Sequence, residues 1–260
     1  MHADELLAIA IEASHLAGDL LLKRYEGPAE GISAKTTPTD LVSDADRDAE
    51  ALLLDFISSK RPGDGVLSEE GGGARSTTGV EWVIDPLDGT INFLYGLPAW
   101  SVSIAARDEE GELVGVVHNP RLGETFTAAR GAGAEMNGSG IHVSTRDDLS
   151  KALIGTGFAY DAAAREVQAR IVAHVLPRVR DVRRAGSAAL DLASLACGRL
   201  DGFYEASMEE WDKAAGILLI KEAGGVVTEL SSPLPELSPG VIAANPDLHP
   251  LLSALVSEED

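Results

Sequence analysis

The feature that most constrains this chain is an apolar segment at residues 82–84 that runs directly into two aspartates, Asp85 and Asp88. Pro86 and Gly89 lie beside these aspartates, a combination that predicts a buried strand followed by a tight turn presenting both carboxylates. Hard oxygen ligands at this spacing suit Mg²⁺, which binds a few carboxylates together with water and phosphate. The amides after Gly89 can open a helix, and a helix N-terminus accepts phosphate oxygens.

Two other interpretations of this segment compete with a metal site. Asp-Pro-x-Asp-Gly is good turn chemistry, so taken alone the segment is equally compatible with a plain chain reversal. Phosphatases of the haloacid-dehalogenase type place a nucleophilic Asp two residues before a second Asp. Here Asp85 and Asp88 are one residue further apart, which would point the second carboxylate elsewhere and disfavours a phospho-aspartate mechanism.

The length of 260 residues allows one large domain or two intimate subdomains, and a hydrophobic content of 45% predicts a globular chain. We expect a single domain over residues 1–260. The polar stretch at 144–151 is the best boundary within it, dividing subdomains 1–146, which would bind metal, and 147–260.

The charge balance limits the partners of this chain. A formal net charge of −21 opposes direct attraction to nucleic acid or anionic membranes. The single cysteine, Cys197, excludes an intrachain disulfide and suits a reducing compartment. The N-terminal residues lack a basic region, and no apolar run approaches the ~18 residues of a membrane span. These features predict a cytoplasmic protein.

Hydrophobic periodicity predicts alternating helices and strands without a strict βαβ rhythm, which indicates mixed α/β or α+β layers. The predicted helices are 4–25, Ser43 or Asp44 to Lys60, 161–175, 187–197, 212–223 and 246–256. The predicted strands are 66–68, 101–106, 113–118, 124–129, 202–204, 226–228 and 241–243, the second to fourth forming an antiparallel meander. Polar or glycine-rich loops are expected at 30–40 and 71–73.

Further acidic residues occur in positions that fit a site. Asp212 lies at a predicted helix N-terminus, where an isolated Asp is usually a cap. Glu69 ends a short strand before the glycine loop, and its simplest interpretation is a solvated loop acid. Each residue alone is weak evidence for a site, and the two become stronger evidence only together with Asp85 and Asp88.

Asp44, Asp46 and Asp48 resemble the opening of a calcium-binding loop. However, Ala49 stands where that loop needs glycine for its sharp turn, and Asp55 stands where glutamate is expected. On a helix, residues two apart do not share a face. A calcium loop is therefore disfavoured, and at most two of these aspartates face a site.

Several long segments resemble the inositol monophosphatase family of Mg²⁺-dependent, lithium-sensitive phosphatases. The two principal matches are residues 81–93 and 210–216, the latter continuing to 222–225. Supporting matches are Lys35, 40–46, 68–70 and 184–192. Their order and spacing cover nearly the whole chain, so the resemblance is specific. It implies a layered α-β-α-β-α sandwich of the sugar-phosphatase type, in the α/β (α+β) class, and a homodimer.

The resemblance implies a site with two or three Mg²⁺ ions. Glu69, Asp85, the Leu87 carbonyl and Thr90 would surround the first ion. The second would be held by Asp85, Asp88 and Asp212, and a third ion would lie near Glu69. No covalent enzyme intermediate is needed in such a site.

Residue roles follow from the same resemblance. The catalytic group would comprise a water-activating pair together with a lysine on a closing loop and a metal-binding glutamate: Thr90, Asp46, Lys35 and Glu69. Phosphate oxygens would rest on the Gly89 and Thr90 amides. Substrate hydroxyls would meet Asp88, Gly186, Ala188, Glu205 and Asp212.

The implied function is hydrolysis of a phosphate monoester, foremost myo-inositol-1-phosphate. Histidinol phosphate and other sugar phosphates are alternatives, fructose-1,6-bisphosphate is less favoured, and a non-enzymatic role beside the transcription machinery is a further alternative. One departure affects the substrate: Glu209 stands where relatives often carry His or Arg. Arg184 fits equally a place beside the substrate or dimer face and a surface salt bridge.

Overall fold

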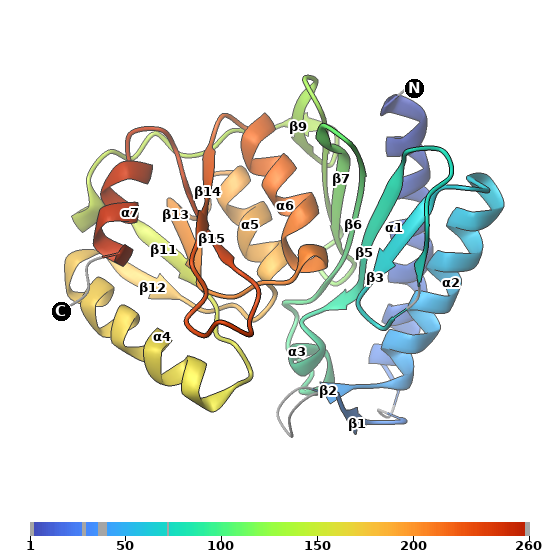
Figure 1. Cartoon of the computed structure of the whole chain (residues 1–260), viewed down its shortest axis with the longest axis horizontal. Helices are drawn as coiled ribbons and strands as arrows, with labels where there is room; N and C mark the ends of the chain where they lie inside the picture. The colour runs from blue at the N-terminus through green and yellow to red at the C-terminus, as the bar shows by residue number, and fades with distance from the viewer. Residues whose placement is uncertain (1–2, 28–29, 36–40, 72, 258–260) are drawn as a thin grey trace.

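Helices and sheets alternate across the molecule in this computed structural model, which describes residues 3–27, 30–35, 41–71 and 73–257 (Figure 1). A pair of helices covers an eight-stranded sheet, a second pair separates that sheet from a five-stranded one, and a third pair covers the outer face of the latter. This α-β-α-β-α order confirms the predicted layered sandwich.

The eight-stranded sheet has the order β10-β9-β8-β7-β6-β5-β3-β4. All its pairs are antiparallel except β3 with β5, and its β6-β7-β8 portion is the predicted meander. Its strands are β3 (Gly65–Ser68), β4 (Gly73–Ala74), β5 (Glu81–Asp88), β6 (Ser101–Asp108), β7 (Gly111–Asn119), β8 (Glu124–Ala129), β9 (Gly133–Met136) and β10 (Ser139–Gly140).

The five-stranded sheet has the order β12-β11-β13-β15-β14. β11 is parallel to both of its neighbours, and β15 is antiparallel to both of its own. Its strands are β11 (Leu153–Thr156), β12 (Asp181–Arg183), β13 (Gly202–Glu205), β14 (Val226–Leu230) and β15 (Gly240–Ala244). A separate small pair joins β1 (Ser33–Ala34) to β2 (Leu41–Val42).

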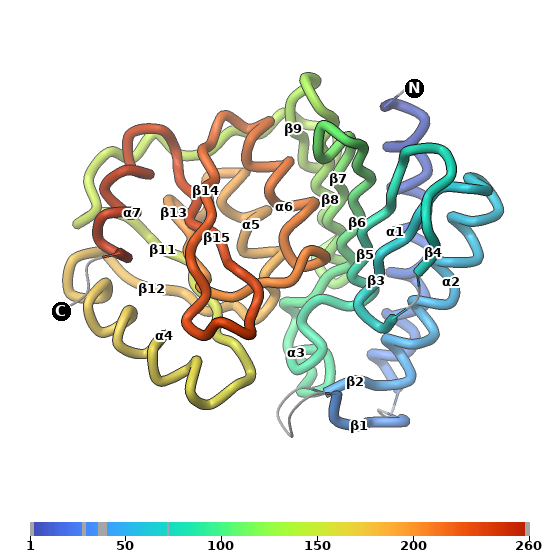
Figure 2. The backbone as a smooth tube through the Cα atoms, viewed as in Figure 1, coloured from blue at the N-terminus to red at the C-terminus, as the bar shows by residue number. Residues whose placement is uncertain are grey.

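The helices divide among the layers as the tube trace shows (Figure 2). On the outside of the large sheet lie α1 (Ala3–Tyr25) and α2 (Asp44–Lys60), and between the sheets lie α5 (Ala188–Ala196) and α6 (Glu210–Glu222). The remaining helices are the short α3 (Thr90–Leu94), α4 (Ala162–Val175), α7 (His249–Ser257) and the 3₁₀ turns η1 (Leu149–Lys151) and η2 (Leu176–Arg178).

Small residues at helical spacing let α1 approach the sheet closely. Ala10, Ala13 and Ala17 are fully buried and lie on one face, because residues three and four apart share a side of a helix. They join a hydrophobic cluster that includes Trp82 of β5 and Trp100, which immediately precedes β6. Through this face α1 packs against the large sheet, on the outer side of the strands that include β5 (Figure 1).

The segment from Asp85 to Asp88 does not form the predicted tight turn. Strand β5 continues through Asp88, and its pairing with β6 shifts register between Asp85 and Asp88. The physical reason is Pro86, which has no N–H to donate to the sheet, so the ladder is interrupted without the chain reversing. Gly89 then adopts a left-handed φ of 92°, as expected for the exit residue.

Other boundaries also differ from expectation. The helix predicted from Asp212 begins at Glu210, and the one predicted from Pro246 begins at His249. Before that last helix, the Asn245 side chain accepts hydrogen bonds from the next turn and holds it outside the helix. Strands β11 and β12 were not anticipated. Within the loops predicted at 30–40 and 71–73, residues 36–40 and 72 lie outside the described residues.

Across the described ranges, every helix is too short or too polar to cross a membrane.

Candidate active site

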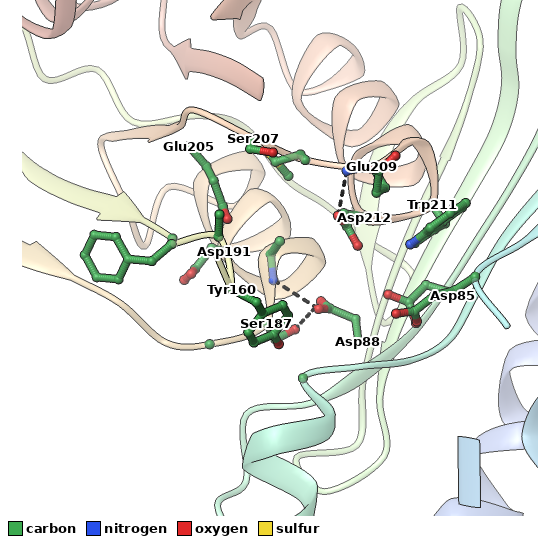
Figure 3. Close-up of a pocket in the computed structure, with 18 of the residues that line it drawn as sticks. Asp85, Asp88, Tyr160, Ser187, Asp191, Glu205, Ser207, Glu209, Trp211 and Asp212 are labelled. Carbon is green, nitrogen blue, oxygen red and sulfur yellow. Dashed lines mark hydrogen bonds between the residues drawn. The ribbon is translucent and has the colours of Figure 1, made fainter. Parts of the chain in front are cut away.

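A cavity of about 770 Å³ opens where the ends of β5 and β13 meet the N-termini of α5 and α6. The close-up shows Asp85 and Asp88 on one side, Asp212 and Trp211 above them, and Asp191 and Glu205 across the cavity (Figure 3). The predicted Lys35, Glu69, Leu87, Gly89, Gly186 and Ala188 line the same cavity. Segments far apart in sequence are thus brought to one place.

Strand β5 presents its two aspartates differently. The Asp85 side chain is only 1% exposed, and its Oδ1 accepts a hydrogen bond of 3.0 Å from the Leu87 amide across the interrupted ladder. Asp88 points to the opposite layer and meets the N-terminus of α5. The interruption at Pro86 therefore places two carboxylates of one strand in the cavity.

Asp88 is held by the first residues of α5. Its Oδ2 accepts from the Ser187 hydroxyl at 2.5 Å and from the Ala189 amide at 2.8 Å, and its Oδ1 accepts from the Ala188 amide at 3.2 Å. Free amides at a helix N-terminus stabilise a carboxylate. These contacts join the large sheet directly to the helix layer between the two sheets.

Asp46 and Asp212 share a structural position, since each is the third residue of its helix and closes a capping box. The Asp212 Oδ2 accepts from the Glu209 amide at 2.8 Å, and the Asp46 Oδ2 accepts from the Ser43 amide at 2.8 Å. Asp212 is therefore not the N-cap of α6, because Glu209 takes that place.

The hydroxyl of Thr90 points at Asp46. Thr90 Oγ1 donates to Asp46 Oδ1 over 2.8 Å, while the Leu87 carbonyl lies further away at 3.2 Å. Both Thr90 and Asp46 are buried. Neither residue lines the cavity, but Leu87, whose carbonyl Thr90 contacts, does. The threonine oxygen keeps its lone pairs available for a hydrogen bond from water.

Like Asp46, the other two aspartates at the start of α2 do not line the cavity. Asp44 is half-buried and pairs with Arg47 at 2.8 Å, and Asp48 pairs with Arg24. Because all three aspartates lie on a helix, they form no calcium loop.

Lys35 reaches the site from the loop after β1. Its ammonium group contacts Glu69 Oε1 at 2.7 Å and also contacts Glu70. Burial opposes the charge of Lys35, but the two glutamates outweigh it and raise the lysine pKa. Lys35 therefore neutralises part of the negative charge at this end of the cavity.

Burial dominates the electrostatics of these carboxylates, and repulsion between them adds to it for Asp85 and Asp212. Burial raises the pKa of Asp85 well above its usual range, and the charges of Glu69, Asp88 and Asp212 add to this effect. Burial also raises the pKa of Asp212, again reinforced by Glu69 and Asp88. The pKa of Asp88 is raised by burial despite its three hydrogen-bond donors. Such a group is stabilised by a bound cation.

The donor set fits a hard divalent cation. Carboxylate oxygens and the Leu87 carbonyl are the ligands that Mg²⁺ prefers. Within the described part of the chain, however, no three side chains among His, Cys, Asp and Glu already converge as ligands of one ion. Lys35 and the capping amides hold several of these oxygens apart, so an ion would have to draw them together.

Residues that were predicted to contact the hydroxyl groups of the substrate lie on the far wall of the cavity. Glu205 ends β13, and Gly186 precedes α5 with a left-handed φ of 96°. Arg184 lines the same wall and lowers the pKa of Asp191 and Glu205 electrostatically, but burial outweighs it in both. Glu209 lies at the rim, where the Ser238 hydroxyl contacts both of its carboxylate oxygens at 2.9 and 2.8 Å.

Two residues of this wall were not assigned from sequence. Ser187 is the N-cap of α5 and donates to Asp88, and a serine before an apolar helix is a signal that could have identified it. Asp191 is 5% exposed in the first turn of α5, where burial raises its pKa to about 7. A lone acid within the apolar stretch 188–196 was the available signal.

The layered fold, a cavity lined by carboxylates and by the N-terminal residues of α5, and a buried threonine–aspartate pair next to that lining define a phosphoric monoester hydrolase of the sugar-phosphatase type. A family model described as "Inositol monophosphatase family" matches residues 2–260. The chain belongs to the inositol monophosphatase family, whose members are generally Mg²⁺-dependent phosphatases.

Individual relatives are similar over most of their length. The chain is 48% identical over 217 residues to an inositol-1-monophosphatase of Mycobacterium bovis, covering 80% of this chain and 74% of that protein. It is 40% identical over 257 residues to the Nus factor SuhB of Escherichia coli K12, covering 98% and 96%. The crystal structure of extragenic suppressor protein suhB from Bartonella henselae superposes with a TM-score of 0.91 at 35% identity, covering 98% and 99%.

Proposed function

We propose that the chain hydrolyses myo-inositol-1-phosphate, or a closely similar polyol monophosphate, to the alcohol and inorganic phosphate. The observation that carries this proposal is that Asp85, Asp88 and Asp212 line one cavity, with the buried Thr90–Asp46 pair next to its lining residue Leu87. The Mycobacterium bovis relative named inositol-1-monophosphatase supports the choice of alcohol.

Thr90 and Asp46 orient and deprotonate the attacking water. Because the Thr90 hydroxyl donates its hydrogen to Asp46 Oδ1, the hydroxyl oxygen accepts a hydrogen bond from water. This hydrogen bond orients the water so that a lone pair of the water oxygen points towards phosphorus. As the water attacks, its proton passes to Thr90 Oγ1 and the threonine proton passes to Asp46. The bond from phosphorus to the alcohol oxygen breaks, and that oxygen leaves with a proton from solvent.

Glu69, Asp85 and the Leu87 carbonyl would hold one Mg²⁺ with Thr90 nearby. Asp85, Asp88 and Asp212 would hold a second, and a third could lie near Glu69. When bound, Mg²⁺ supplies positive charge that polarises the phosphoryl group and offsets the charge developing on its oxygens. Lys35 neutralises Glu69 and Glu70 beside this site.

The rest of the cavity would bind the two ends of the substrate. The Gly89 and Thr90 amides, at the start of α3, would donate to phosphate oxygens. Asp88, Asp212, Glu205 and the backbone at Gly186 and Ala188 would accept from or donate to the alcohol hydroxyls. In this role Asp88 and Asp212 would serve both the metal and the alcohol.

Release of inorganic phosphate tests the proposal. We expect release from myo-inositol-1-phosphate that requires Mg²⁺ and is inhibited by Li⁺, with histidinol phosphate, glucose-1-phosphate and fructose-1,6-bisphosphate as competing substrates. The acidic groups of Glu209 at the rim and Asp191 on the far wall make histidinol phosphate, whose alcohol carries an amine, the most informative competitor. A higher kcat/KM for it would reassign the substrate, and no Mg²⁺-dependent release from any ester would refute the activity.

We also propose that the chain acts as one domain, with subdomains 1–146 and 147–260, and that it forms a homodimer. A groove of about 700 Å³ beside the cavity is lined by Leu41, Ile91, Tyr95 and Phe158 among others, and Tyr95 is 76% exposed. Such an apolar surface supports an interface between copies. Light scattering after size exclusion would report the mass, and Tyr95→Asp should shift a dimer towards monomer.

A second role is supported by the 40% identity to the Escherichia coli Nus factor SuhB over nearly the whole chain. We propose a protein partner in the transcription machinery rather than direct RNA contact, because a net charge of −21 repels RNA. Binding of purified RNA polymerase to the unaltered protein and to Asp88→Asn would separate the roles. Binding that survives the loss of turnover supports it, whereas no binding by either protein refutes it.

A further inference from the structure

The carboxylate of Glu205 occupies the alcohol side of the cavity without a hydrogen bond from any described residue. Burial and nearby charges act on this carboxylate instead. Burial raises the pKa of Glu205 well above the usual range, Asp212 and Asp191 add to that effect, and Arg184 opposes it. Figure 3 shows Glu205 at the edge of the cavity near Asp191. Something other than hydrogen bonding must therefore determine where this carboxylate lies, and its oxygens remain available to a ligand.

Gly157 supplies a steric seat for that carboxylate. In the parallel register of β11 and β13, Ile154 pairs with Gly202 and Thr156 with Tyr204, so the next position places Gly157 beside Glu205. A Cβ atom on Gly157 would lie 2.0 Å from Glu205 Oε2 and 2.4 Å from Oε1. The carboxylate thus fills the space that a side chain at position 157 would take.

Gly240 fixes the backbone of the same glutamate from the other side. In the antiparallel pairing of β13 with β15, Glu205 lies opposite Val241, and a Cβ on Gly240 would lie 1.7 Å from the Glu205 carbonyl oxygen. Neither Gly157 nor Gly240 has a positive φ, so any residue could adopt its backbone conformation. The requirement for glycine at both positions is space alone.

We propose that Gly157 is a positioning residue that determines specificity for the alcohol: it seats the Glu205 carboxylate where its free oxygens accept hydrogen bonds from substrate hydroxyls. This inference rests on the proposed function for the identity of the alcohol. A methyl group at position 157 displaces the carboxylate, while the phosphate end at Thr90 and Asp85 is untouched. Substrates with hydroxyl-bearing alcohols lose binding, and esters without hydroxyls do not.

The test compares two substrates in steady-state kinetics. For Gly157→Ala we expect KM for myo-inositol-1-phosphate to rise about 10- to 100-fold with kcat nearly constant, the effect of lost hydrogen bonds to a charged group. For 4-nitrophenyl phosphate, whose ring has no hydroxyl, we expect less than about a threefold change in either constant. Gly140→Ala is the matched control, because nothing lies within 4 Å of its Cβ position and its φ is not positive.

A double-substitution cycle separates positioning from general damage. In Glu205→Ala there is no carboxylate to displace, so adding Gly157→Ala should change the ratio of the two kcat/KM values by less than about twofold. The paired variant also removes the steric clash and keeps the test valid if the single variant folds poorly. Equal losses on both substrates in Gly157→Ala, or additive losses in the paired variant, would overturn the inference.

A crystal structure of Gly157→Ala gives a readout that does not depend on turnover. A Glu205 carboxylate that leaves its seat supports the inference, and one that keeps its position overturns it. If the unaltered enzyme releases no phosphate from myo-inositol-1-phosphate, the proposed function fails. The crystallographic position and the ratio for glycerol-2-phosphate against 4-nitrophenyl phosphate then still decide the role of Gly157.

Discussion

Replacing Asp191 with asparagine should stabilise the metal-free protein at neutral and alkaline pH. Asp191 is 5% exposed, and burial together with the charge of Asp88 raises its pKa from an ordinary 3.8 to about 7. This displacement corresponds to a cost on the order of 4 kcal/mol when the group is ionised, at about 1.4 kcal/mol per pH unit. Asparagine keeps the shape, can still accept from the Ala185 amide, and carries no charge.

The sign of the pH dependence follows from the raised pKa. Below about pH 4 the carboxyl is neutral in both folded and unfolded chains, so Asp191→Asn changes little. Between about pH 4 and pH 7 the unfolded chain loses its proton while the folded chain keeps it, and the cost grows. The gain from asparagine should be about 2 kcal/mol near pH 5.5 and about 4 kcal/mol near pH 8.5, both as upper estimates.

Urea unfolding in EDTA, followed by circular dichroism at both pH values, measures this gain. Asp55→Asn, an exposed position on α2, is the matched control and should show no pH-dependent difference. Mg²⁺ should shrink the gain, because it offsets the charge of Asp88. An Asp191→Asn protein that is no more stable than the unaltered one at high pH, or whose gain is the same at both values, would refute the reasoning.

Substitutions at three further positions test the parts of the site separately. Thr90→Ala should lower kcat about 10²- to 10⁴-fold while Mg²⁺ still raises the melting temperature, and Thr90→Ser should recover most of the rate; a normal rate in the alanine variant contradicts the proton path through Asp46. Asp85→Asn should raise the melting temperature in EDTA and abolish its increase with Mg²⁺, so an unchanged response to Mg²⁺ in thermal scans would exclude Asp85 as a ligand. Ser187→Ala removes a hydroxyl donor to Asp88 and should weaken Mg²⁺ binding about 10- to 100-fold in calorimetric titration, whereas unaltered affinity contradicts the orienting role.

Local signals were sufficient for most elements of the fold. The alanine face of α1, the Ser43 cap of α2 and the meander of β6, β7 and β8 all follow from periodicity and turn residues in one stretch of chain. Strands β11 and β12 lacked such a signal, because both are defined by their parallel pairing with neighbours in the sheet. Their existence depends on pairing that no local window contains.

The residues of the site likewise divide into those with a local sequence signal and those that depend on strand pairing. The motifs around Asp85 and Asp212 identified residues that the structure brings to one cavity, although a cap for Asp212 and a turn for Asp85 were the simplest local expectations. The seat that Gly157 provides for Glu205 could not be predicted, since it depends on the register between two strands. Sequence spacing predicts which residue types belong to the site, whereas steric contacts between strands can be read only from the assembled sheet.

The contacts that Asp88 makes with α5 have a consequence for the order in which the chain is synthesised. Asp88 and Ser187 are 99 positions apart, and Asp212 follows later still. A nascent chain that ends before α6 therefore lacks a complete carboxylate set, however well its first sheet has folded. Mg²⁺ would bind the finished fold and not these partial chains, so each ion bound draws the population towards full-length native protein by mass action.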